Sequence, residues 1–187
     1  MFIRHIEKFI DWPVLCQQHI DAAEKRGFEQ SLVGEEQILN TRIRNNSSST
    51  YFSETHAKMI TDYLVDKCLV PELEDYTFSS AGDFFRVYRY EPGNYFKPHK
   101  DGSVEKNNEV SLITLLIYLN DADGGDTVIM PYGKLQEWAY KRFSPKCGDA
   151  LMFEHNIWHS GEPVNSGFKY VLRTDLFYTC NDAVKAV

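Results

Sequence analysis

Residues 111–120 read SLITLLIYLN, an almost unbroken run of β-branched and aliphatic side chains. A run of this length is typical of a buried strand. Clusters of Gly, Pro, Asn and Asp separate it from similar runs on both sides, and no helical pattern lies between them. This arrangement predicts an antiparallel sandwich or barrel and argues against a parallel α/β sheet. The other runs are FFRVYRY (84–90), DTVIM (126–130), DALMFEH (149–155) and FKYVLRTDLFY (168–178).

The first third of the chain has a helical pattern. Pro13 can stand in the first turn of a helix that Gly27 ends, and Ser53 can cap a second helix that ends before Pro71. We therefore predict a mostly β protein with flanking helices (α+β). Its double-stranded β-helix (jelly roll) core would span residues 81–180, buttressed by an N-terminal helical layer at residues 1–80, all within one domain of residues 1–187.

The segment RIRNN (42–46) belongs to a polar, turn-rich stretch that predicts a loop or a short connecting strand. Its arginines, Arg42 and Arg44, are expected to be solvated.

Composition limits the class of protein. The chain has 187 residues, of which 43% are hydrophobic, and this suits one well-packed domain. The net charge of −7 argues against a nucleic acid or an anionic membrane as the main partner. Four scattered cysteines predict free thiols, and the charged N-terminus shows no secretory signal, so we expect a cytoplasmic protein.

Metal-binding side chains form one cluster in the sequence. YFKPHKDG (95–102) contains His99 and Asp101, which can point to the same side of a strand. A third ligand can come from His155 or His159. Two histidines and one carboxylate on one face of a metal are typical of non-haem Fe(II) oxygenases, whereas a tetrahedral zinc site would support hydrolysis.

Three blocks carry a family pattern: YRYEPGNYFKPHKDG (88–102), LITLLIYLND (112–121) with GGDT (124–127), and GDALMFEHNIWHSGEPVNSGFKYVLRTD (148–175). They resemble the 2-oxoglutarate- and Fe(II)-dependent dioxygenases, and most closely their prolyl 4-hydroxylase-like branch. The resemblance implies that His99, Asp101 and a distal histidine bind iron. The Pro-Val turn and Gly-x-Lys that follow select His159 over His155.

The resemblance also implies a binding site for 2-oxoglutarate. The cation that pairs with its distal carboxylate stands ten residues after the distal histidine, which is Lys169 here. Arg173 shares the face of Lys169; it would assist there or meet an anionic group of the primary substrate, with a salt bridge to Asp175 as the alternative. Tyr90 resembles a family tyrosine that hydrogen-bonds the co-substrate. Thr114, in an otherwise apolar strand, is expected to face the same pocket.

The activity implied by the resemblance is hydroxylation of a C–H bond with release of succinate and CO2. O2 would be consumed, and ascorbate would serve as reductant. The substrate suggested by this branch is a peptidyl proline, with a free amino acid or another small molecule as the alternative. A rival reading is a jelly-roll hydrolase or isomerase that uses Zn or Mn, but such an enzyme would have no use for Lys169.

Overall fold

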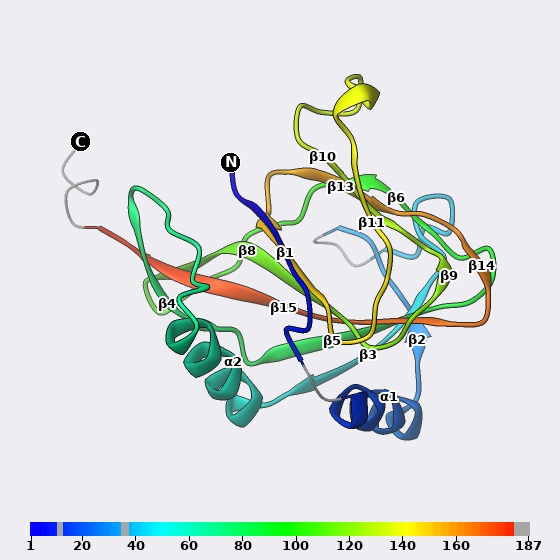
Figure 1. The fold of residues 1–187 in the computed structure, drawn as a ribbon, viewed down its shortest axis with the longest axis horizontal. Coiled ribbons are helices and arrows are strands. Elements are labelled where there is room, and N and C mark those ends of the chain that lie inside the picture. Colours follow the sequence, from blue (N-terminus) through cyan, green and yellow to red (C-terminus); the bar gives the residue numbers. More distant parts are fainter. Residues whose placement is uncertain (11–12, 35–37, 182–187) are drawn as a thin grey trace.

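Two antiparallel sheets form the body of the protein (Figure 1), and the computed structural model describes residues 1–10, 13–34 and 38–181. The larger sheet has, in spatial order, β1 (Ile3–Ile6), β12 (Ala150–Glu154), β8 (Glu109–Tyr118), β15 (Lys169–Cys180), β5 (Phe84–Tyr90), β3 (Ser47–Phe52) and β2 (Glu29–Gln30); β4 (Tyr76–Ala81) pairs with β15 and β7 (Glu105–Lys106) pairs with β8. The smaller sheet has β11 (Lys141–Phe143), β10 (Thr127–Met130), β13 (Trp158–Gly161) and β6 (Phe96–His99), and β9 (Asp123–Gly124) pairs separately with β14 (Val164–Ser166).

All five hydrophobic runs form strands, and the predicted jelly-roll fold class is confirmed. Strand β8 lies between β12 and β15, and most of its residues are buried. Burial on both faces explains why its sequence is apolar throughout instead of alternating. The strands that carry the core therefore come from the part of the chain with the strongest sequence signal.

Two α-helices occur in the described residues, and they pack below the larger sheet in Figure 1. Helix α1 (Pro13–Arg26) begins at its proline and ends before Gly27, whose φ of 89° is costly for other residues. Helix α2 (Glu54–Asp66) is capped by Ser53, whose hydroxyl accepts a hydrogen bond from the backbone N–H of His56 (3.2 Å). Both helices therefore begin where the sequence predicts.

The predicted helical layer of residues 1–80 describes this part of the chain incompletely. Strands β1, β2, β3 and β4 also lie there, and all of them join the larger sheet. Tyr51 of β3 stacks on Phe85 of β5, with ring centroids 5.1 Å apart. Because these strands complete the hydrogen bonding of the sheet, no structural boundary falls at residue 80.

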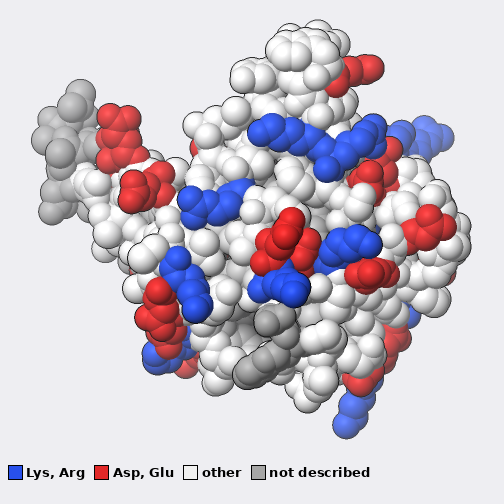
Figure 2. Space-filling view, viewed as in Figure 1, with Lys and Arg blue, Asp and Glu red and all other residues white. Residues whose placement is uncertain are grey.

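The surface view in Figure 2 shows Lys and Arg interspersed with Asp and Glu over this face. Of the helices in the described ranges, none combines the length and the apolar character needed to cross a bilayer. The short 3-10 helix η1 (Glu137–Ala139) lies in the connection between β10 and β11, which projects from the top of Figure 1.

Candidate metal centre

His99 and His159 face each other across two neighbouring strands of the smaller sheet. They are register partners in the antiparallel pairing of β6 with β13. The Nδ1 atom of His99 lies 2.8 Å from the carbonyl oxygen of Lys97, and that of His159 lies 3.0 Å from the carbonyl oxygen of Ile157. Because a carbonyl only accepts, each Nδ1 carries the proton, and each Nε2 presents a lone pair.

Asp101 completes the cluster from just beyond the strand. Strand β6 ends at His99, so the expected sharing of one strand by His99 and Asp101 is wrong. The backbone N–H of Asp101 donates instead to the carbonyl oxygen of His155 (3.0 Å), which fixes the turn. The ligand atoms of His99, Asp101 and His159 lie within 4.8 Å of one another, so the structure selects His159 over His155.

The electrostatics favour the protonation states that a metal requires. Burial lowers the pKa of His99 well below its ordinary value and also lowers the pKa of His159. Burial alone would raise the pKa of Asp101, but Arg173 and the two histidines hold it well below its usual range. Two neutral imidazoles and an ionised carboxylate are therefore ready to bind a divalent cation without losing protons.

Lys169 is a buried cation at the start of β15. It is 2% exposed, and its Nζ lies 5.1 Å from the ring centroid of Tyr90 and 5.6 Å from that of Tyr118. Its ammonium donates to the carbonyl oxygen of Gly125, but no carboxylate of the described residues lies within 4.0 Å of it. Burial lowers the pKa of Lys169 to about 7, although Asp126 opposes this shift. A buried ammonium with no carboxylate in direct contact among the described residues can pair with the carboxylate of a ligand.

Arg173 lies against the metal cluster. Its Nη1 donates to Asp101 (2.8 Å), and its Nε and Nη2 donate to Asp175 (3.2 and 3.0 Å). The ion pair with Asp175, which the sequence offered as the alternative, is therefore present and extends to Asp101. Contact of Arg173 with 2-oxoglutarate or with the primary substrate stays a prediction.

Thr114 and Tyr90 both face the interior between the sheets. The Thr114 hydroxyl donates to the Asp101 carboxylate (2.5 Å), so its polar partner is the metal cluster. Tyr90 is the register partner of Lys169, and burial raises its pKa to about 12, which keeps its hydroxyl protonated as a donor. A direct contact of either residue with the co-substrate stays a prediction.

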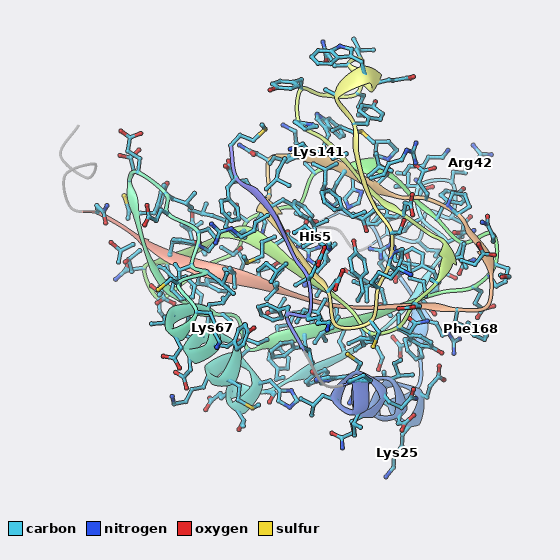
Figure 3. The ribbon with its side chains drawn as sticks, viewed as in Figure 1. His5, Lys25, Arg42, Lys67, Lys141 and Phe168 are labelled. Carbon is cyan, nitrogen blue, oxygen red and sulfur yellow. The ribbon has the colours of Figure 1, made fainter. Side chains whose placement is uncertain are left out.

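Arg44 is the residue near the site that the sequence placed wrongly. Arg42 is exposed at the edge of the molecule (Figure 3), as expected, but Arg44 is only 6% exposed. Its guanidinium lies 4.1 Å from the ring centroid of Phe96 and 4.8 Å from that of Tyr88. Phe96 in turn stacks on His99, with centroids 3.5 Å apart. Residues 44 and 96 meet in a β-bridge, and no local sequence signal predicts that pairing.

The family model described as the 2OG-Fe(II) oxygenase superfamily matches residues 85–174, a range that contains the whole metal cluster and Lys169. Over this range, the chain is similar to the 2OG-Fe(II) oxygenase superfamily. "Probable prolyl 4-hydroxylase 3" of Arabidopsis thaliana is 29% identical over 185 residues, which cover 83% of this chain but only 62% of that protein. The chain thus spans less than two thirds of the length of this plant relative.

Two solved structures of prolyl hydroxylases share the fold. A prolyl hydroxylase of Trichoplax adhaerens, in complex with a hypoxia inducible factor peptide fragment, superposes with a TM-score of 0.70 at 20% identity and covers 94% of this chain and 83% of its own. A viral collagen prolyl hydroxylase of Paramecium Bursaria Chlorella virus-1, in complex with 2OG, superposes with a TM-score of 0.61 at 22% identity. The match covers 96% of this chain and 97% of the viral one. The metal of this superfamily is Fe(II) and its co-substrate is 2-oxoglutarate; two histidines, a carboxylate and the buried Lys169 fit both.

The low pKa of Lys169 predicts a pH dependence of stability. Its pKa is about 7 in the fold and 10.5 in an ordinary environment, so between these values the unfolded chain binds more protons. The free energy of unfolding of the metal-free, 2-oxoglutarate-free protein should therefore rise by about 2 kcal/mol from pH 7 to pH 9. Urea unfolding at several pH values measures this, and Lys169→Met should flatten the rise. An equal rise in Lys169→Met would contradict the assignment.

Proposed function

We propose that the protein is an Fe(II)- and 2-oxoglutarate-dependent hydroxylase that acts on a peptidyl proline. The observation that carries this proposal is that one fold contains both a three-residue metal cluster and a buried cation. The cluster of His99, Asp101 and His159 suits Fe(II), and the buried Lys169, which forms no ion pair within the described residues, suits the distal carboxylate of 2-oxoglutarate. In a zinc hydrolase no 2-oxoglutarate carboxylate would pair with Lys169, so nothing would offset the free-energy cost of burying its ammonium.

When bound, Fe(II) and 2-oxoglutarate supply the oxidising chemistry that places one oxygen atom of O2 in a C–H bond and releases succinate and CO2. The protein supplies the geometry and the charges. His99, Asp101 and His159 would hold the metal through two imidazole nitrogens and one carboxylate. Lys169 would neutralise the distal carboxylate, and Tyr90, whose ring centroid lies 5.1 Å from the Lys169 Nζ, would donate a hydrogen bond to it.

Aromatic rings cover the two histidines of the metal cluster. Phe96 stacks on the His99 ring, and the ring of Phe153 lies 4.5 Å from that of His159, so these rings limit the access of bulk water to both imidazoles. Lys169 is itself only 2% exposed, and this burial would strengthen its interaction with a bound carboxylate because less water screens the two charges.

The names of the relatives support a proline substrate. The plant relative is named a prolyl 4-hydroxylase, and the structure from Trichoplax adhaerens holds a peptide fragment. A panel of proline-containing peptides with matched Pro→Ala peptides tests this, with free amino acids as a second arm. We expect succinate release and the gain of one oxygen atom, seen by mass spectrometry, only for proline peptides. Hydroxylation of free amino acids, or equal turnover of the Pro→Ala peptides, would refute the proposed substrate.

A further inference from the structure

We propose that Arg173 is a positioning residue, which holds the Asp101 carboxylate in its metal-binding orientation and is itself held by Asp175. The inference rests on the metal centre of the proposed function. It does not depend on the identity of the hydroxylated substrate, because metal binding can be measured without one. Arg173 thereby takes a different role from Lys169, although both side chains come from the same face of β15.

The Asp101 carboxylate is held at both of its oxygens. Arg173 Nη1 donates to Oδ1 (2.8 Å), and the Thr114 hydroxyl donates to Oδ2 (2.5 Å). The Nε2 atoms of His99 and His159 lie 3.9 and 3.6 Å from Oδ1 and Oδ2, respectively. Each carboxylate oxygen has about two lone-pair sites, so a site remains for the metal after these donors are satisfied. The orientation of the ligand is thus set before any metal arrives.

The guanidinium of Arg173 is fixed in turn by Asp175. Its Nε and Nη2 both donate to Asp175 Oδ1, which holds the plane of the guanidinium and aims Nη1 at Asp101. Asp175 is the register partner of Thr114 in the pairing of β15 with β8. The two residues that donate to Asp101, Arg173 and Thr114, therefore come from neighbouring strands. Two further groups lie near the Asp175 carboxylate: Arg86 Nη1 is 3.9 Å from its Oδ2, and His155 Nε2 is 3.5 Å from its Oδ1. The planar guanidinium of an arginine can donate to Asp101 and Asp175 at the same time, whereas the single ammonium of a lysine does not fit this arrangement.

The charges support the same role. Two buried carboxylates, Asp101 and Asp175, share Arg173 between them, and their side chains are 5% and 11% exposed. Without the guanidinium, two like charges would face each other in a poorly solvated interior. Lys169 already supplies a cation for a ligand carboxylate, and it has no protein carboxylate of its own within the described residues. Arg173 is therefore committed to the protein ligand and Lys169 to the co-substrate.

Metal titration of the full chain tests this role. Co(II) affinity and the Co(II) visible spectrum, which reports ligand geometry, are measured for Arg173→Lys and Asp175→Asn. We expect Arg173→Lys to weaken Co(II) binding by about 10–100-fold and to shift the spectrum, and Asp175→Asn to do so less strongly. The matched control is Arg86→Lys, because Arg86 also lies beside Asp175 but forms no hydrogen bond or ion pair with Asp101. The Co(II) affinity of this variant should stay within about twofold of that of the original chain.

A second measurement separates this role from the binding of 2-oxoglutarate. The anaerobic 2-oxoglutarate affinity of the Mn(II)-loaded protein, at saturating metal, should be nearly the same in Arg173→Lys as in the original chain. Two results would overturn the inference. One is Co(II) affinity and spectrum unchanged in both Arg173→Lys and Asp175→Asn. The other is unchanged metal binding together with weakened 2-oxoglutarate binding, which would make Arg173 a co-substrate residue.

Discussion

Replacing His99 with alanine is expected to abolish succinate formation. The substitution leaves one imidazole and one carboxylate, too few ligands to retain Fe(II) at working concentrations. The fold should survive, because the ring lies at the end of β6 and its stacking on Phe96 is worth about 0.5–1.5 kcal/mol. Succinate release and urea unfolding measure the two effects. Asp101→Ala should give the same loss of turnover, and Co(II) titration should show weakened metal binding in both variants.

The matched control for this experiment is His19→Ala. It removes an imidazole whose Nδ1 contacts the Tyr51 hydroxyl (3.3 Å) between α1 and β3, on the other side of the larger sheet from the metal cluster. Its turnover should match that of the original chain. Full turnover in His99→Ala, or an equal loss in His19→Ala, would show that the metal assignment is wrong.

Lys169→Met is expected to change ligand affinity and stability in opposite directions. Removing one partner of a buried charge pair costs about 2–5 kcal/mol, so 2-oxoglutarate should bind roughly 30- to 4,000-fold more weakly. The protein without ligand should instead become more stable at pH 7, by roughly 2–4 kcal/mol, because burial already lowers the pKa of this ammonium to about 7. Calorimetric titration with 2-oxoglutarate and urea unfolding measure these changes.

Lys141→Met supplies the control, since Lys141 lies exposed on β11 (Figure 3). This change should leave affinity unaltered and stability within about 0.5 kcal/mol of the original. If Lys169→Met binds 2-oxoglutarate normally while Arg173→Lys does not, the two cations have the opposite roles.

The fold and the metal ligands were predictable because their signals are local. An apolar run such as residues 111–120 must be buried wherever it lies, and His99 and Asp101 are two positions apart. The helix limits at Pro13 and Ser53 follow from backbone chemistry within a single turn. The choice of His159 over His155, and the position of Lys169 ten residues later, came instead from the resemblance to the dioxygenase family.

The sequence therefore predicted the jelly-roll class, the two helices and the three residues of the metal cluster. Only the tertiary structure decided the partners of Arg173 and the burial of Arg44. Arg173 meets Asp101 across 72 positions of sequence, and Arg44 meets Phe96 through an isolated β-bridge. The partner of a long polar side chain depends on which strands lie beside it. That arrangement is set by the packing of the whole sheet, so no short segment of sequence contains it.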